Sequence, residues 1–267
     1  MTARPPAGTR TFKLTLSYDG GAYVGWQRQA NGPSIQAEIE SALARVEGAP
    51  VTVVGAGRTD AGVHAVGQVA SLWLRNPIPA DALGRALNAT LPPDIRVVAV
   101  DEAPASFHAR FDAVAKVYRY RLLRGPVASP FERRYGWHVG DALDLDRMAT
   151  AGRLLVGEHD FAAFQATGSD TVTTVRRLHA LTLRPGVSGT VPGDETGGGA
   201  TLVEVRGDGF LRHMVRIIVG TLVDVAAGRT TPAAVEAALR TGDRGAAGPT
   251  APPHGLFLAR VDYARPA

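Results

Sequence analysis

Hydrophobic and polar residues alternate near the start of the chain. Residues 12–18 place apolar side chains at every second position, a period of two that predicts a half-buried strand. Over residues 35–46 the apolar spacing changes to three and four, which predicts a helix with one buried face. Ser34 has the chemistry of an N-cap for this helix, and Gly48 has that of its C-terminal stop.

The same patterns extend along the rest of the chain. They predict strands at 51–54, 68–74, 95–100, 116–123, 175–183, 201–206 and 256–263, and helices at 81–88, 145–156, 210–225 and 232–239. Glycine and proline are concentrated in residues 185–200, which predicts a mobile hairpin tip whose role stays open.

A strand, a helix and paired strands follow one another once in each half of the chain. This order predicts an α+β fold in which two related halves place mostly antiparallel sheets side by side, with helices on one face and a central cleft. We expect a disordered tail at residues 1–10, an N-terminal half at 11–105 and a C-terminal half at 106–267 that completes the cleft.

Composition limits the possible partners only weakly. Hydrophobic residues make up 45% and charged residues 20%, and the net charge is +4 with a pI of about 9.7. Lys13 and Lys116 are the only lysines, so 27 of the 29 basic residues are arginine. Arginine suits phosphate and base contacts, but a general bias toward Ala, Gly, Val and Pro explains this composition equally well. The charge therefore permits RNA as a partner without requiring it.

The sequence also bears on the compartment. No run approaches the roughly 18 apolar residues of a membrane span, and residues 1–10 lack the apolar core of a signal peptide. Cysteine is absent, which excludes disulfides and thiolate chemistry. We expect a cytoplasmic protein without a membrane partner.

Most common catalytic signatures are missing. The chain has no GxSxG elbow, no HExxH helix and no GxxxxGK[ST] phosphate loop, and its seven histidines are not at metal-ligand spacing. We therefore expect no cofactor and no metal. What remains is a glycine-rich loop at residues 55–62, which carries Arg58 and Asp60. Asp60 is either a catalytic carboxylate or an aspartate that caps a turn, which is common for this residue.

A series of motifs supports the first interpretation. Residues 57–65 read GRTDAGVHA, which resembles the signature of the tRNA pseudouridine synthase A family. Other segments resemble that family in the same order: YDG at 18–20, GWQ at 25–27, LNA at 87–89, LP at 91–92, FHAR at 107–110, YRY at 118–120, GFL at 209–211, HMVR at 213–216 and GL at 255–256. The resemblance covers nearly the whole chain.

The resemblance implies an enzyme that isomerises uridines 38, 39 and 40 in the anticodon stem-loop of tRNA without a cofactor. It implies two RRM-like (ferredoxin-like) halves and a homodimer with tRNA bound across both subunits. It places Asp60 on the catalytic aspartate, Tyr118 on a base-stacking tyrosine and Arg216 on the arginine that pairs with that aspartate.

The chemistry of the reaction is compatible with these roles. A carboxylate can attack C1′, add to C6 of the base or remove the C2′ proton, and the sequence leaves all three routes open. Each route needs Asp60 to be ionised in a site away from water, where burial raises the pKa of a carboxyl group. A neighbouring arginine such as Arg216 opposes this rise and favours the ionised form. Tyr118 can stack on a flipped base or simply pack in a sheet. Arg58 is a candidate phosphate contact, and Leu256 is either an apolar pocket wall or a core residue.

Three alternatives remain at this stage. The first is a noncatalytic RNA-binding protein with RRM-like halves, which leaves the glycine-rich loop without a purpose. The second is a pseudouridine synthase with another RNA substrate. The third is a carboxylate glycosidase, which needs a second acid, for which Asp19 and Asp112 are the candidates.

Overall fold

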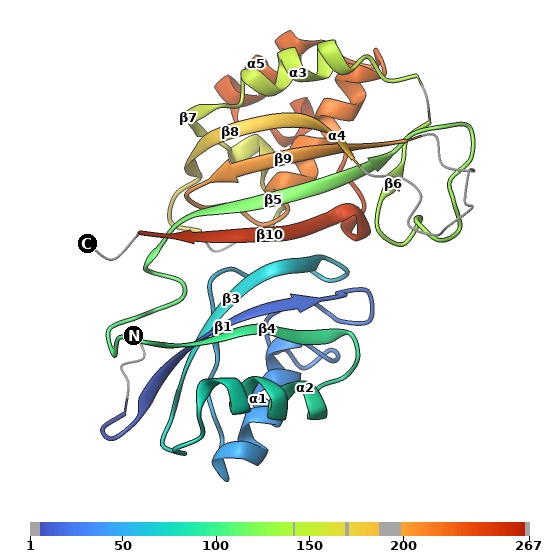
Figure 1. Ribbon diagram of the computed structural model, residues 1–267. Helices are drawn as coiled ribbons and strands as arrows, with labels where there is room; N and C mark the ends of the chain where they lie inside the picture. Colours follow the sequence, from blue (N-terminus) through green and yellow to red (C-terminus); the bar gives the residue numbers. More distant parts are fainter. Residues whose placement is uncertain (1–5, 141, 169–170, 187–198, 265–267) are drawn as a thin grey trace. The chain divides into compact units, whose positions relative to one another are not determined.

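The computed structural model describes residues 6–140, 142–168, 171–186 and 199–264. The chain divides into two compact units (Figure 1). The first comprises Met1–Val114 with Leu258–Ala267, and the second comprises Ala115–Phe257. The final strand thus returns to the first unit, whereas the sequence had suggested a single division between residues 105 and 106.

The first unit consists of an antiparallel sheet and two helices. Its elements are β1 (Arg10–Tyr18), α1 (Ile35–Glu47), β2 (Val54–Gly55), β3 (His64–Leu74), α2 (Ala80–Thr90), β4 (Ile95–Ala103) and most of β10 (Leu256–Tyr263). The strands lie in the order β4-β1-β3-β10, with β2 paired to β3. Strand β1 is central and antiparallel to both β3 and β4.

Local sequence explains why the first strand and helix form. Phe12, Leu14 and Leu16 are fully buried, as the alternating pattern predicts. Ser34 caps α1 by accepting a hydrogen bond from the Ala37 amide at 3.4 Å. The helix ends at Gly48, whose φ of +75° is in the left-handed region that favours glycine.

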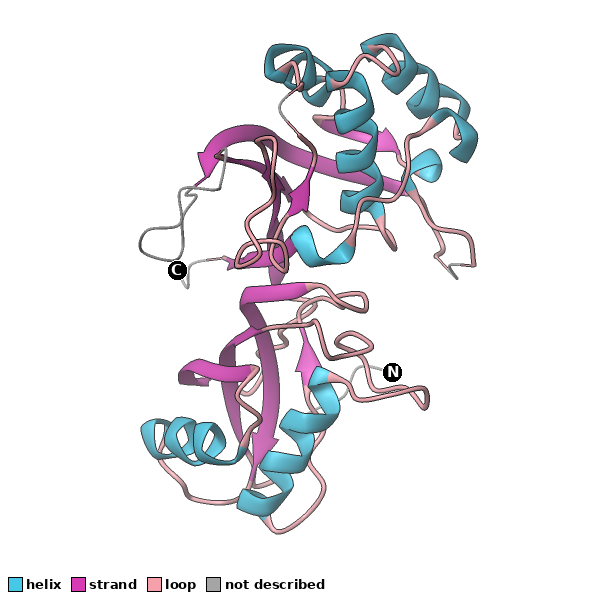
Figure 2. Ribbon diagram, turned by 90° about the vertical axis from the view of Figure 1, so that its right-hand side faces the viewer, coloured by secondary structure: helices cyan, strands magenta, loops and turns pink. Residues whose placement is uncertain are grey.

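The second unit contains mostly antiparallel strands and three helices. Its elements are most of β5 (Ala113–Leu123), β6 (Trp137–His138), α3 (Leu145–Arg153), β7 (Gly157–Asp160), β8 (Val175–Gly186), β9 (Ala200–Gly207), α4 (Met214–Ala226) and α5 (Pro232–Thr241). The order is β5-β9-β8-β7, and β6 pairs with β5 in parallel. Figure 2 shows the three helices gathered on one side of these strands.

Helix α4 differs from its prediction at its start. It begins at Met214 and not at Phe210, because His213 adopts a left-handed conformation with φ of +62° and interrupts the helix. Arg212 therefore precedes the helix. Helix α4 is buried on nearly every side, and within it only Arg216 and Asp224 are not buried.

The other predicted elements agree with the structure to within a few residues at their ends, with some exceptions. The expected strand at 51–54 is reduced to β2, and α3 ends at Arg153, before the predicted residue 156. The short strands β6 and β7 were not predicted. Most of the expected tip (187–198) and half of the expected tail (1–5) lie outside the described residues.

The predicted α+β class is confirmed by both units. The side-by-side arrangement of the two halves and the cleft between them stay predictions. No helix in the described part of the chain has the length and apolar character needed to cross a membrane.

Candidate active site

The loop that carries Asp60 joins β2 to β3, and we call residues 56–63 the Asp60 loop. A hydrogen bond from the Ala56 amide to the Val69 carbonyl (2.8 Å) fixes its start, and one from the Val63 amide to the Asp60 carbonyl (3.1 Å) closes its end. Exposure alternates within it, since Arg58 is exposed, Thr59 is buried and Asp60 is half-buried. Arg58 and Ala61 are thus the exposed residues of this segment, and the Asp60 side chain is partly accessible.

A second loop, residues 19–27, holds the Asp60 loop through its backbone, and we call it the clamp loop. The Trp26 amide donates to the Thr59 carbonyl at 3.0 Å, and the Gly62 amide donates to the Tyr23 carbonyl at 3.4 Å. Gly25 forms an isolated antiparallel bridge with Asp60 itself. The GWQ motif at 25–27 thus supports the loop that presents the carboxylate, a role that the sequence did not reveal.

Close packing between these two loops requires glycine in the clamp loop. Gly25 has a φ of +111°, and a Cβ there would lie 2.5 Å from the Thr59 carbonyl oxygen. A Cβ at Gly20 would overlap the Val63 carbonyl oxygen. The two loops therefore approach each other more closely than any side chain at these two positions allows.

A buried polar cluster lies beneath the Asp60 loop. The hydroxyl oxygens of Tyr18 and Thr59 are 2.9 Å apart. The Gln68 side-chain amide donates to the Gly57 carbonyl at 2.7 Å and to the Tyr18 hydroxyl at 3.4 Å. Sequence reasoning missed this cluster, although Tyr18 belongs to the YDG motif and Thr59 to the GRTDAGVHA motif.

Tyr118 lies on the central part of β5 in the second unit. It is opposite Val205 of β9 and is 7% exposed. Its ring meets the ring of Phe210 edge-on, with centroids 5.0 Å apart and planes at 81°. Phe210, from the GFL motif, thus orients the tyrosine.

Arg216 is held by a short segment that runs along α4, residues 248–251, which we call the strap. The Arg216 Nε donates to the Ala251 carbonyl at 2.7 Å, and the Ala251 amide donates to the Arg216 carbonyl at 3.1 Å. The Gly248 amide donates to the Thr221 hydroxyl at 2.8 Å. A Cβ at Gly220 would overlap the Pro249 carbonyl oxygen, so glycine in the helix allows this approach.

The residues after the strap connect Arg216 to the segment that bears Leu256. The Tyr120 hydroxyl donates to the Pro252 carbonyl at 2.8 Å. Burial raises the pKa of Tyr120, and the Arg216 charge opposes that rise. Burial lowers the pKa of His254, and the Arg216 charge adds to this effect. The charge of Arg216 therefore affects the pKa of both Tyr120 and His254. Leu256 follows this segment as the first residue of β10 and is 4% exposed.

The predicted site residues thus form two groups. Arg58 and Asp60 lie together in one loop of the first unit. Tyr118, Arg216 and Leu256 belong to the second unit, in which the strap and the residues after it link the last two. The pairing of Asp60 with Arg216 stays a prediction.

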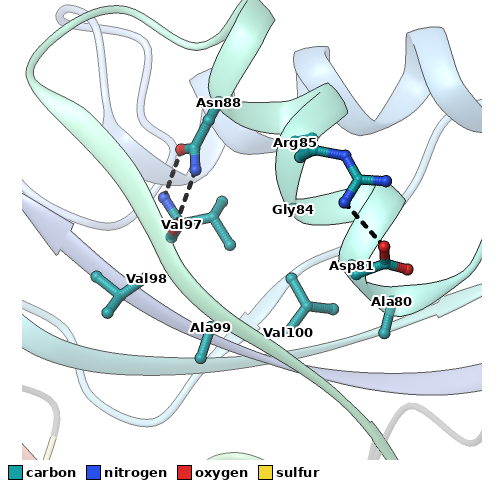
Figure 3. A pocket seen from close by; sticks show the side chains of 9 residues that line it. All are labelled: Ala80, Asp81, Gly84, Arg85, Asn88, Val97, Val98, Ala99 and Val100. Atoms are coloured by element: carbon teal, nitrogen blue, oxygen red, sulfur yellow. Dashed lines mark hydrogen bonds and ion pairs between the residues drawn. The ribbon is translucent and has the colours of Figure 1, made fainter.

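A hollow of about 440 Å³ lies elsewhere in the first unit, between α2 and β4 (Figure 3). The Asn88 side chain bonds both the amide and the carbonyl of Val97 at 2.8 Å, along the edge of β4. The LNA motif thus secures an edge strand, and none of the predicted site residues lines this hollow.

We found no cluster of three or more His, Asp or Glu side chains suited to a metal ion within the described ranges.

The chain is similar to known proteins over most of its length. A family model described as tRNA pseudouridine synthase matches residues 15–112 and 151–264. The chain is 48% identical to tRNA pseudouridine synthase A of Syntrophotalea carbinolica over 252 residues, which are 94% of this chain and 96% of the relative. It is 46% identical to the protein of that name from Geotalea uraniireducens, over 95% of this chain and 100% of the relative.

Similarity to solved structures is much weaker. The crystal structure of a Cbf5-Nop10-Gar1 complex contains a chain that is 14% identical, with a TM-score of 0.32. The match covers 79% of this chain and 45% of that one.

Proposed function

This chain belongs to the tRNA pseudouridine synthase family and isomerises uridine in tRNA to pseudouridine, and we propose that Asp60 is its catalytic carboxylate. We also propose that its targets are uridines 38, 39 and 40 of the anticodon stem-loop. Membership of this family removes the noncatalytic RNA-binding protein and the glycosidase from the alternatives.

The observation that carries the proposal for Asp60 is the way its loop is held. Two neighbouring strands, a clamp loop and a buried polar cluster fix the backbone around a half-buried carboxylate. A turn aspartate with no further role does not need such support. Asp60 also lies within the motif that most strongly resembles the family's signature.

The other candidate residues have complementary roles in the proposal. Isomerisation breaks the bond between C1′ and N1 and joins C1′ to C5; C5 loses its proton and N1 gains one, with no change of redox state. The base must leave the RNA stack first, which costs a few kcal/mol. We propose that Tyr118 stacks on the extruded base, that Arg58 contacts a phosphate, that Arg216 favours the ionised form of Asp60, and that Leu256 supplies an apolar wall.

Two broader properties rest on the family resemblance and on the tRNA substrate. We propose that the enzyme is a homodimer that binds tRNA across both subunits, and that it works in the cytoplasm, where tRNA is modified.

Replacing Asp60 by asparagine tests the assignment of the catalytic carboxylate. The variant keeps the size of the side chain but loses its charge, so we expect at least a 10³-fold loss of turnover, on the order of 4 kcal/mol, with tRNA binding retained. Tritium release from C5-labelled uridine measures turnover. Wild-type turnover in a folded, tRNA-binding Asp60→Asn protein would refute the assignment.

Mapping pseudouridine in tRNA from cells with and without the protein tests the target positions. The modification should disappear at positions 38, 39 and 40 only. Loss at another position would establish a different substrate without changing the role of Asp60.

Replacing Tyr118 by phenylalanine separates stacking from proton transfer. The ring and its edge contact with Phe210 remain, so we expect tRNA affinity to change by less than about threefold. If the hydroxyl takes or gives the proton at C5, turnover falls by about 10²-fold. Unchanged turnover would leave stacking as the role of Tyr118, and a large loss of tRNA affinity would contradict both.

A further inference from the structure

The buried cluster beneath the Asp60 loop connects that loop to the centre of the sheet. Tyr18 is the last residue of β1, and Gln68 lies within β3. Gln68 is fully buried, Tyr18 is 3% exposed and Thr59 is 6% exposed. Polar groups as buried as these are normally retained only when they are hydrogen-bonded, and here the bonds run to a functional loop.

Tyr18 links the other two side chains of the cluster. Its hydroxyl accepts a hydrogen bond from the Gln68 amide and shares another with the Thr59 hydroxyl, in which either oxygen can be the donor. Burial raises the pKa of Tyr18 to about 12, so its hydroxyl stays protonated throughout the neutral range.

The cluster forms hydrogen bonds to the Asp60 loop at two residues that are separated by one position. Gln68 bonds the Gly57 carbonyl, and Tyr18 bonds the Thr59 side chain. Arg58 lies between these anchors, and Asp60 follows the second of them. The Thr59 carbonyl is held in addition by the Trp26 amide, so Thr59 is tied through both its side chain and its backbone.

Packing around the cluster leaves the loop little freedom to shift. Trp26 is 2% exposed, and its ring lies 6.1 Å from the ring of Tyr18. A Cβ at Gly55 would lie 2.5 Å from the Trp26 ring. The same tryptophan thus covers the cluster and the start of the loop.

We propose that Tyr18, Thr59 and Gln68 are positioning residues that set the orientation of Asp60 through the backbone of its loop. The proposal rests on the proposed role of Asp60 as the catalytic carboxylate. Displacing a reacting group by about 1 Å can cost about 10²-fold in rate, so a support of this kind affects turnover more than binding.

Tyr18→Phe and Thr59→Val test the proposal, because each removes one polar group and keeps the shape of the side chain. We expect kcat to fall by about 10²-fold in each, with KM and the Kd for tRNA within about threefold of wild type. Thr59→Ser keeps the hydroxyl and should restore most of the kcat. The double variant combines Tyr18→Phe with Thr59→Val, and both changes break the hydrogen bond between these two side chains. Its kcat should therefore be no lower than that of the less active single variant.

Thr11→Val is the matched control. Thr11 lies on the same strand as Tyr18, is 3% exposed, and its hydroxyl has no hydrogen-bond partner within the described part of the chain. It should retain wild-type kcat, whatever the change in melting temperature.

Three results would overturn the proposal: wild-type kcat in Thr59→Val, no recovery in Thr59→Ser, or multiplicative losses in the double variant. Asp60→Asn is measured in parallel. If that variant is active, the proposed function of Asp60 has failed. If it is inactive while Tyr18→Phe and Thr59→Val have full kcat, only the positioning role has failed.

Discussion

At the scale of single residues, the conformation of the Asp60 loop depends on a glycine in the neighbouring clamp loop. Gly25 has no Cβ, and this allows the clamp loop to bridge Asp60 and to contact the Thr59 carbonyl. The conformation of Gly25, with φ of +111°, adds a backbone requirement to this steric one. Glycine at this position therefore serves both the local backbone and the presentation of the carboxylate.

We expect Gly25→Ala to reduce turnover by at least tenfold, since the methyl group would displace the Thr59 carbonyl and with it Asp60. Gly48→Ala is the control, because Gly48 also has a positive φ but a Cβ there would meet nothing within 4 Å. Both variants should lose about 1–2 kcal/mol of stability from the backbone alone. Turnover and the free energy of unfolding are measured for both variants. Equal turnover in Gly25→Ala and Gly48→Ala would contradict a functional role for the close contact between Gly25 and the Thr59 carbonyl.

At the scale of elements, α4 and its strap form the support for Arg216. The helix is buried on almost every side, and the strap follows it through reciprocal bonds between Arg216 and Ala251. Gly220 allows the strap to come this close. Arg216 thus keeps a defined orientation, although arginine is one of the most flexible side chains.

Because of this packing, we expect replacement of glycine by alanine in α4 to have the opposite effect on stability from the usual one. Alanine normally stabilises the interior of a helix by about 1 kcal/mol relative to glycine. We expect Gly220→Ala to destabilise the protein by about 2–3 kcal/mol instead, since overpacking forces the strap away. Gly84→Ala in α2 is the control, as its Cβ would meet only the Val100 Cγ2 at 3.3 Å, and it should be neutral or stabilising. Denaturant unfolding measures both, and a stabilised Gly220→Ala protein would contradict the prediction.

At the scale of the whole molecule, the basic net charge is compatible with the tRNA substrate. The net charge is +4 and nearly all basic residues are arginine. Contacts between such residues and phosphates release counterions, so affinity for RNA depends on salt.

We expect the Kd for tRNA to rise steeply with salt, by a factor set by the number of phosphate contacts. Arg58→Ala should lower the slope of log Kd against log salt by about one if Arg58 contacts a phosphate. Arg85→Ala is the control, because Arg85 is already paired with Asp81 at 2.8 Å within α2. A slope that is the same in the Arg58 variant and in wild type would argue against this contact.

The periodic spacing of apolar residues was sufficient to predict most of the helices and strands. Strand β10 was predicted with its observed limits, and α1 with both of its caps, since these features depend on neighbouring residues in the chain. The start of α4 was predicted wrongly, because the apolar spacing continues through Phe210 while the left-handed His213 breaks the helix. A pattern of side chains does not report a backbone angle.

By itself, the sequence determined the α+β class, the motifs that identify the family, and Asp60 as the leading candidate carboxylate. Only the tertiary structure revealed what holds Asp60: a clamp loop some 35 residues earlier in the chain and a buried cluster built from two strands and the loop itself. The physical reason is that hydrogen bonds, burial and steric clearance depend on distances in space. Residues far apart in sequence, such as Tyr18, Thr59 and Gln68, therefore acquire a common role only when the chain has folded.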